Sequence, residues 1–379
     1  MAASTITPAS RRESFLSRFE VGGRARVLPM EGVRGLAVLM VFCVHYANHF
    51  KPYAAPGFAT QAARWMEVAG QAGVDLFFAL SGYLIYGLAL ERKGSLGQFL
   101  ERRLRRIYPP FLAVLVLYLC VFLLAPSWAK WPAEGRLSYV AANALLLPGV
   151  FDMAAAITVA WSLSYELLFY LTVPFAAMAA KTWPRGLRIA VIVLLSAVYS
   201  ALSISYFPGK VDGIPLYLFR HPYLLAFAAG MVAWEWRPLL KAASGWRDLA
   251  AAALSIGAVA ATVPLADPSV EAGVAMYLRA ALLGAASVAL SLAAYGPAGA
   301  LARALSWRPL RLMGNASYSF YLIHSVGVHA AAWAAARVLP PEQWRGFPFW
   351  GLMAWALAVS LLLAAGLFLT VERRWSLRR

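Results

Sequence analysis

The strongest constraint on this sequence is a succession of apolar segments, each about as long as a lipid bilayer is thick. A membrane-spanning helix needs about 20 predominantly apolar residues. About ten segments of this kind occur, at residues 33–51, 72–91, 107–125, 155–179, 187–206, 216–235, 248–266, 273–294, 315–337 and 348–371. Because only 13% of the residues are charged, against about 25% in soluble proteins, we predict an all-α polytopic membrane protein.

The positions of the basic residues predict the orientation of the chain. With ten spans, 25 of the 34 Lys and Arg residues fall on the side of the N-terminus. Cytoplasmic loops carry an excess of Lys and Arg, so both termini are expected in the cytoplasm. The loops predicted on the opposite side are short, at residues 57–70, 126–136, 207–215 and 340–348. Residues 138–150 are too short to span and are predicted to be re-entrant or interfacial.

The domain organisation follows from the same pattern. Residues 1–30 form a polar, basic cytoplasmic tail without the apolar region of a cleaved signal peptide. Residues 31–371 form one transmembrane domain, and residues 372–379 form a basic cytoplasmic tail. The net charge of +17 is divided among short clusters between spans, which indicates topology rather than nucleic-acid binding. The two cysteines lie inside apolar segments and form no metal-binding motif, and no metal is expected.

The first span carries two residues that are unusual at membrane depth. Arg34 and His45 are eleven residues apart, which places them on one helix face with an offset of about 20° and a separation of about 16 Å along the axis. Ionisable groups within a membrane are costly and indicate function by default. These two residues are therefore the first catalytic candidates.

A dense basic cluster precedes the third span, within the stretch ERKGSLGQFLERRLRRIYPP (91–110). Arginines at such a position often serve only as a cytoplasmic anchor. Guanidinium groups also bind phosphate in bidentate fashion, and six basic residues within fifteen exceed what orientation requires. The predicted phosphate-binding residues are Arg102, Arg103, Arg105 and Arg106.

Two further spans carry polar candidates. In the second span, Asp75 is expected to cap the helix or pair with a basic group, and Ser81 beside Gly82 is either a close packing point or a site residue. In the fourth span, Ser162 and Glu166 are four residues apart and share a face. A glutamate at this depth requires either a structural partner or a water-filled cavity.

The ninth span contributes Ser317, Tyr321 and His324 on one face, with His329 further along. A buried histidine of this kind can also be purely structural, satisfied by a tyrosine or a backbone carbonyl.

The predicted depths of the ionisable residues coincide. His45 and His324 lie about 15–16 Å from the cytoplasmic face, and Glu166 lies about 16 Å from the opposite face. In a hydrocarbon core about 30 Å thick, all three fall near the midplane, with Ser81 close to them. We therefore expect the three helices to bring these groups together.

Five motifs together resemble a known family. They are MEGVRGLAVLMVFCVH, GVDLFFALSGYLI, RRLRRIYP, WSLSYELLFYL and GNASYSFYLIH. In this order they are similar to the motifs of the acyltransferase 3 family, integral-membrane enzymes that acylate carbohydrates, from about residue 31 to 371. The departures are Glu31, where the family often has Asp, and Tyr83, where it often has Phe. The resemblance is to stand-alone members, which lack a fused extracytoplasmic domain.

The resemblance implies the transfer of an acyl group. The donor would be an acyl-CoA, usually acetyl-CoA, and the acceptor a sugar hydroxyl or a glycolipid. The coenzyme A phosphates would rest on the arginine cluster and Arg34. His45 would act as general base with Glu166 as its partner, or would itself form an acyl-histidine intermediate. The acceptor-binding or supporting residues would be Asp75, Ser81, Ser162, Tyr321 and His324. No tightly bound cofactor is expected, and the location is the cytoplasmic membrane of a bacterium.

Two other classes of protein also fit some of these features. A proton-coupled transporter or flippase for a lipid-linked or small glycan would use His45 and Glu166 as a proton relay. It explains the arginine cluster less well, and no pair of interrupted helices typical of such carriers is apparent. A non-enzymatic partner of a glycan synthase would need neither midplane residue.

Overall fold

The chain is helical throughout the part that the structure describes. The computed structural model describes residues 16–20, 27–92, 94–132, 134–151, 153–206, 222–239, 245–266, 272–295, 299–344 and 346–377. Within these ranges no strand forms, and the β-type pairing is limited to one bridge between Pro148 and Phe151. The prediction of an all-α chain is confirmed for these residues.

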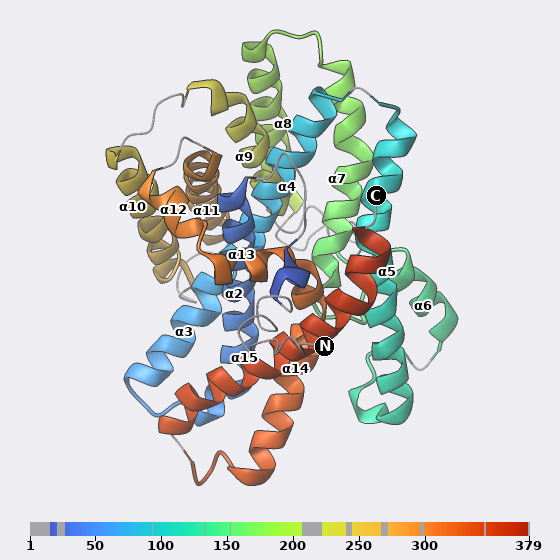
Figure 1. Cartoon of the computed structure of the whole chain (residues 1–379), viewed down its shortest axis with the longest axis vertical. Helices are drawn as coiled ribbons and strands as arrows, with labels where there is room; N and C mark the ends of the chain where they lie inside the picture. Colours follow the sequence, from blue (N-terminus) through green and yellow to red (C-terminus); the bar gives the residue numbers. More distant parts are fainter. Residues whose placement is uncertain are drawn as a thin grey trace, which may run out of the picture.

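Figure 1 shows how the helices are arranged along the chain. They are α2 (Leu28–Phe50), α3 (Phe58–Gly70), α4 (Ala72–Leu90), α5 (Leu96–Leu124), α6 (Arg136–Ala144), α7 (Ala160–Ala179), α8 (Arg185–Tyr206), α9 (Tyr223–Trp236), α10 (Gly245–Ala261), α11 (Ala272–Tyr295), α12 (Ala300–Leu305), α13 (Arg308–Asn315), α14 (Ser317–Val338) and α15 (Phe347–Leu367). A π-helix, η7 (Phe368–Ser376), continues α15, and short 3₁₀ turns include η2 (Lys51–Tyr53) and η3 (Pro126–Trp128).

Seven stretches of helix are long and apolar enough to cross a membrane. They are Leu28–Tyr53, Phe58–Leu90, Leu96–Leu124, Ala160–Ala179, Arg185–Ile204, Ala275–Ala294 and Pro348–Ser376. The other three predicted spans coincide with α9, α10 and α14. α9, with 14 residues, is shorter than a typical span, and α10, with 17, is at the lower end of the length that spans a bilayer. α14 has 22 residues, but serines, tyrosines and histidines lower its hydropathy.

Two segments that were not predicted to span are helical as well. The prediction of a loop at residues 57–70 is wrong, because Phe58–Gly70 forms α3 and buries Ala59, Ala63 and Val68. Its alanine-rich sequence has high helix propensity, and its apolar face packs on α2. Residues 138–150 contain the end of α6, a helix of 9 residues, which is too short to span, as predicted.

Helix α2 lies at the centre of the molecule and packs against α3, α4, α13 and α14 (Figure 1). Its contact with α13 brings the two backbones together. A Cβ atom at Gly35 would clash with the Leu310 carbonyl, and one at Gly314 would clash with the Glu31 carbonyl. Such close approach is possible only where side chains are absent. This packing holds the face of α2 that carries Arg34 and His45 in a defined orientation.

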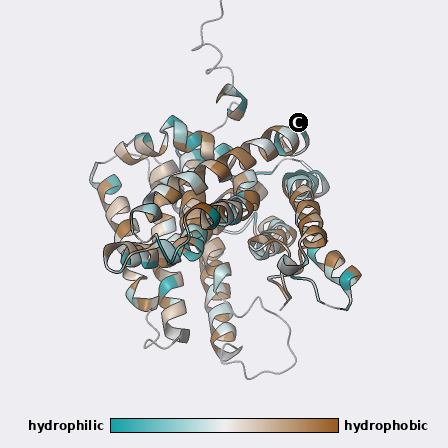
Figure 2. Cartoon of the chain, turned by 90° about the horizontal axis from the view of Figure 1, so that it is seen from below, coloured by the Kyte–Doolittle hydropathy of each residue, from teal (hydrophilic) through white to brown (hydrophobic). Residues whose placement is uncertain are grey.

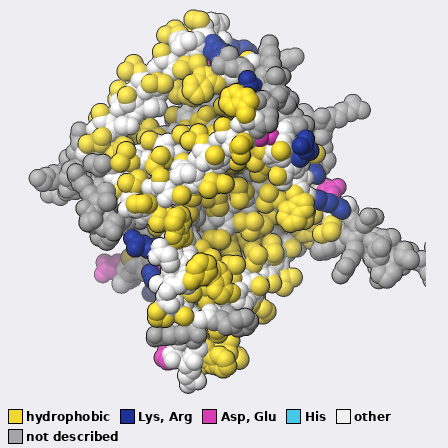
Figure 3. Space-filling model, turned by 90° about the vertical axis from the view of Figure 1, so that its left-hand side faces the viewer, with side chains coloured by type: hydrophobic (Ala, Val, Ile, Leu, Met, Phe, Trp, Pro, Cys, Tyr) yellow, Lys and Arg dark blue, Asp and Glu magenta, His cyan; other side chains and the backbone are white. Residues whose placement is uncertain are grey.

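The outer surface of the molecule is apolar along its helices. Figure 2 shows hydrophobic residues running along the helices, and Figure 3 shows hydrophobic side chains spread over one broad face, with Lys and Arg near its margins. On α8, Val193, Leu194, Leu195 and Ile204 are all exposed. Contiguous exposed apolar surface of this extent is uncommon in soluble proteins and is expected of helices that face lipid.

A buried ion pair joins α8 to α9. The Arg188 guanidinium donates to both carboxylate oxygens of Glu235, at 2.7 and 2.9 Å. The Tyr86 hydroxyl of α4 donates to the same carboxylate at 2.6 Å. Because Glu235 is almost fully buried, these three hydrogen bonds are needed to satisfy its charge.

Candidate active site

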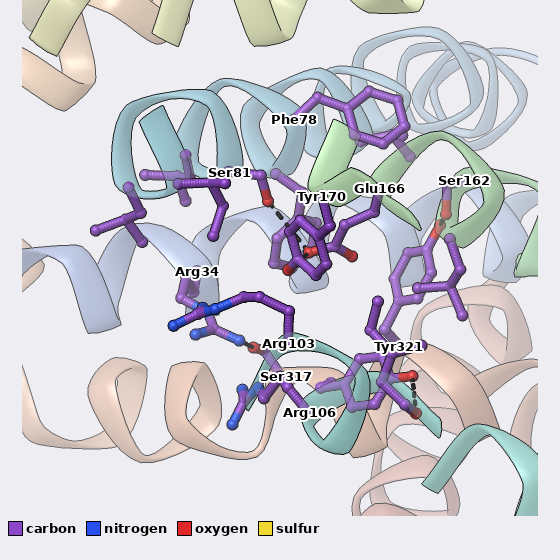
Figure 4. Close-up of a pocket in the computed structure, with 18 residues that line it drawn as sticks. Arg34, Phe78, Ser81, Arg103, Arg106, Ser162, Glu166, Tyr170, Ser317 and Tyr321 are labelled. Carbon is purple, nitrogen blue, oxygen red and sulfur yellow. Dashed lines mark hydrogen bonds between the residues drawn. The ribbon is translucent and has the colours of Figure 1, made fainter. Parts of the chain in front are cut away.

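A cavity of about 870 Å³, including its opening, lies among α2, α4, α5, α7 and α14. Its polar lining residues are Arg34, Ser81, Arg103, Arg106, Ser162, Glu166, Tyr170, Ser317, Tyr318 and Tyr321. Figure 4 shows that the three arginines gather on one side, whereas Ser162 and Tyr321 lie toward the other. The first, second, fourth and ninth predicted spans therefore do contribute to one site.

The three cavity arginines differ in how they are held. Arg34 donates to the Ser317 hydroxyl at 3.0 Å. Arg106 pairs with Glu372 of η7 at 3.3 Å. Arg103 stacks on the Phe99 ring, with 5.4 Å between its Cζ atom and the ring centroid. Among the described residues Arg103 has no hydrogen bond or ion pair, and its buried Nε has no partner.

The basic cluster before the third span is divided by helix geometry. Arg103 and Arg106 are three residues apart on α5, share a face and point into the cavity. Arg102 and Arg105 are exposed and do not line it. Arg105 instead pairs with Glu101 at 2.7 Å, one turn earlier on the same helix. The structure thus places two of the four predicted phosphate-binding residues at the cavity.

Glu166 is held inside the cavity by two hydroxyl groups. Ser81 donates to its Oε1 at 3.3 Å, and Tyr170 donates to the same oxygen. Ser162, one turn earlier on α7, hydrogen-bonds the Tyr321 hydroxyl at 2.7 Å. Tyr170 was not predicted from the sequence, although it lies four residues after Glu166 and so shares its face. The carboxylate is therefore a partner of Ser81 and Tyr170, and it has no direct contact with an imidazole among the described residues.

Ser81 serves the cavity, and its neighbour Gly82 serves packing. The backbone carbonyl of Phe227 on α9 lies where a Cβ atom of Gly82 would be. Gly82 is therefore the close packing point, and Ser81 lines the cavity.

His45 lies beyond the cavity lining, against His324. Their ring centroids are 4.9 Å apart with the rings nearly perpendicular. Arg34 contacts Ser317 and His45 contacts His324, so both residues of α2 face α14, as their eleven-residue spacing predicts. The ring nitrogens of His45 have no hydrogen bond to any described residue, and the side chain is partly exposed.

His324 is fully buried and half satisfied. Its Nδ1 donates to the Tyr321 carbonyl at 2.7 Å, so this nitrogen carries the proton. Its Nε2 is buried without a partner among the described residues and therefore presents a lone pair. The Tyr321 ring lies between the cavity and this histidine, with 6.1 Å between the two ring centroids.

A second pair of histidines lies one turn further toward the end of α2. The Nε2 atoms of His49 and His329 are 2.9 Å apart. The Trp128 ring lies against His329, with centroids 6.1 Å apart. Nearby, Lys130 donates to the Thr158 hydroxyl at 2.9 Å, and partial burial lowers the pKa of this lysine. His49 was not predicted as a site residue.

Asp75 is buried on α4 but does not line the cavity. It interacts electrostatically with Arg279 of α11, which fits the predicted pairing with a basic group. In the part of the chain that the structure describes, no group of three or more His, Cys, Asp or Glu residues is arranged to hold a metal ion.

Comparison with known proteins identifies the family. Residues 29–370 match the acyltransferase 3 model, which describes an acyltransferase domain. The chain belongs to the acyltransferase 3 family. It is therefore a membrane acyltransferase. No solved structure matches the chain.

Three relatives of this chain are named for different activities. The exopolysaccharide production protein ExoZ of Rhizobium meliloti is 30% identical over 71% of this chain and 80% of its own length. The acyltransferase MdmB of Streptomyces mycarofaciens is 26% identical over 91% of this chain and 90% of its own. The peptidoglycan O-acetyltransferase OatA of Listeria monocytogenes is 28% identical over 85% of this chain, which covers 52% of that protein.

Proposed function

We propose that this protein transfers an acyl group, most simply acetyl, from cytoplasmic acyl-CoA to a hydroxyl group of a glycan or glycosylated acceptor. The observation that carries the proposal is the arrangement of the cavity. Three arginines lie at one end of it, and a histidine pair lies just beyond Tyr321 at the other. The names of ExoZ, an exopolysaccharide production protein, and OatA, a peptidoglycan O-acetyltransferase, support a glycan acceptor.

The proposed orientation has ten spans with both termini in the cytoplasm of a bacterium. It is supported by the excess of Lys and Arg on one side of the helices. In this orientation the first span begins at the cytoplasmic face, so Arg34 faces the donor and His45 lies deeper. The end of α2 that carries His49, and η3 with Trp128 just after α5, then lie toward the extracytoplasmic side.

The donor phosphates bind the cavity arginines. Arg103 suits this role because it has no ion pair among the described residues, and a guanidinium presents two parallel donors to a phosphate. Glu166 offsets part of the positive charge of the three arginines. With the phosphates at this end, the thioester extends toward Tyr321 and the histidines.

In the chemical step His45 acts as general base. It takes the proton of the acceptor hydroxyl, the oxygen attacks the thioester carbonyl carbon, and the carbon–sulfur bond breaks. The proton then passes from the imidazolium to the leaving thiolate, which regenerates neutral His45 and releases coenzyme A as a thiol. General base catalysis of this kind contributes about 10²–10⁴-fold. Glu166 assists without contacting His45 directly, because Ser81 and Tyr170 hold its carboxylate inside the cavity.

Reconstituted protein tests the proposal. Vesicles containing the protein receive radiolabelled acetyl-CoA on one side and an oligosaccharide acceptor on the other. We expect labelled acceptor and an equal amount of free coenzyme A from the wild type, and neither from folded His45→Ala. Acceptor labelling by His45→Ala would remove His45 as base. Acceptor movement across the membrane without acetyl-CoA consumption would favour a carrier. Rapid quenching with acid would reveal a labelled protein if an acyl-histidine forms.

A further inference from the structure

The hydrogen bonds of the His49–His329 pair determine its proton content. The Nδ1 atoms of both residues lie 2.8 Å from backbone carbonyls, those of His45 and Ser325 respectively. A carbonyl oxygen only accepts hydrogen bonds, so both Nδ1 atoms carry protons. The two Nε2 atoms are 2.9 Å apart, and a hydrogen bond between them needs a proton on one of the two. That hydrogen bond requires one imidazole of the pair to be doubly protonated, which would give the pair a single positive charge.

The surroundings of this pair add a second cation and an aromatic ring. The Lys130 ammonium acts electrostatically on both His329 and His45. Among the described residues neither Lys130 nor the histidine pair forms an ion pair with a carboxylate. The Trp128 ring beside His329 is about half exposed. The positive charges thus lie at an accessible surface with an adjacent apolar ring, and no described anion balances them.

The histidine pair lies close to His45, the proposed general base. His45 and His49 are four residues apart on α2, so they lie on one face with about 6 Å between them along the axis. An acceptor that reaches His45 from the extracytoplasmic side passes His49 and His329 first. A hydroxyl group at His45 and a neighbouring acidic group at the pair can therefore belong to the same sugar unit or to adjacent ones.

We propose that His49, His329 and Lys130 form a subsite for an anionic group of the acceptor, a carboxylate or a phosphate. The proposal rests on the proposed function and specifies its substrate class, an acidic glycan or a glycan attached to a phosphate-bearing lipid. The Lys130 ammonium donates a charge-assisted hydrogen bond to the anion, and the positive charge of the histidine pair attracts it, while Trp128 covers an apolar face of the sugar. Binding there aligns a hydroxyl group with His45.

The charge of the pair can be tested without any enzymatic activity. Protein labelled with ¹⁵N-histidine in lipid nanodiscs is examined by NMR at neutral pH, with His49→Gln as the comparison. A glutamine amide preserves a donor for His329 but removes the extra proton. We expect the wild type to show one more imidazolium than the variant. Equal numbers of imidazolium signals in the two proteins would overturn the charged pair and, with it, the subsite.

A second experiment compares two kinds of anionic acceptor with an uncharged one. An oligosaccharide of uronic acids, its carboxyl-reduced counterpart, and a neutral sugar on a lipid diphosphate are offered with radiolabelled acetyl-CoA. Charge-assisted hydrogen bonds predict that kcat/KM is at least about tenfold higher for an anionic acceptor than for the reduced one. Preference for the uronic acids assigns the subsite to a carboxylate, and preference for the lipid diphosphate assigns it to a phosphate.

Variants separate the subsite from the reaction itself. His329→Gln and Lys130→Gln are expected to reduce the preference for the anionic acceptor toward unity. The control is Lys51→Gln, which removes a lysine at the same end of α2 that pairs with Glu67 at 3.5 Å. Equal acylation of charged and neutral acceptors by the wild type would overturn the subsite and leave the proposed function standing. If no acceptor of any charge is acylated, the proposed function itself has failed.

Discussion

Arginine 103 offers the sharpest test of donor binding. It is the one cavity arginine without a hydrogen bond or ion pair to a described residue, and its buried Nε has no partner. A hydrogen bond to a charged group is worth about 1.5–3 kcal/mol, so Arg103→Ala should weaken acyl-CoA binding about tenfold to 150-fold. Arg103→Lys should recover only part of this loss, because an ammonium is a point charge and not a bidentate donor.

Arg105 provides a matched control two residues away. Its side chain is 66% exposed, and its partner Glu101 is 55% exposed. Loss of an exposed pair of this spacing costs only about 0.3–0.5 kcal/mol of stability. Because Arg105 does not line the cavity, Arg105→Ala should change donor binding by about twofold or less. The assay is isothermal titration of purified protein in nanodiscs with a non-hydrolysable acetyl-CoA analogue. If Arg103→Ala binds within twofold of the wild type, or if both variants lose affinity equally, the phosphate role of Arg103 is wrong.

Three further changes test the packing and the site. Glu235→Gln should lower the free energy of unfolding by about 3–5 kcal/mol, because it leaves the Arg188 guanidinium without a negative partner. Glu91→Gln, in an exposed pair, should change the free energy of unfolding by less than about 0.5 kcal/mol. Thermal unfolding in detergent measures both, and similar values for the two variants would refute the argument. Gly314→Ala should prevent the approach of α13 to α2 and reduce folded yield, while Gly351→Ala, with open space around it, should not. Tyr321→Phe removes a buried hydrogen bond of 2.7 Å and should destabilise the protein by about 1–3 kcal/mol; an unchanged unfolding temperature would contradict this.

Helical periodicity predicted a large part of the site. The spacing of Arg34 and His45 placed them on one face, and α14 does meet both. The depth argument brought His45 and His324 together correctly. It also expected Glu166 beside these histidines, whereas among the described residues its carboxylate contacts Ser81 and Tyr170 and neither imidazole. These predictions needed only the rise and rotation of a helix, because each concerns positions along a single element.

Most contacts between helices could not be predicted from the sequence. Nothing in the spacing of the basic cluster indicates which arginines face inward, since that depends on the rotation of α5 against its neighbours. Glu372, which satisfies Arg106, is 266 positions away and lies in a π-helical turn. His49 and His329 are separated by 280 positions. The helical α3 was missed because its 13 residues are too few for a span, so the segment was assigned to the loop between two spans.

The hydrogen bond between Tyr321 and Ser162 has a consequence for the cell's energy supply. In the proposed orientation, the donor cavity lies toward the cytoplasm and the histidines toward the outside, so these two side chains are part of a thin layer of described residues between them. A membrane potential is worth about 2.3 kcal/mol per elementary charge per 100 mV, and a continuous water column would dissipate it. The layer must let an acyl group cross while blocking ions. We therefore expect Tyr321 to act as electrical insulation as well as a wall of the cavity.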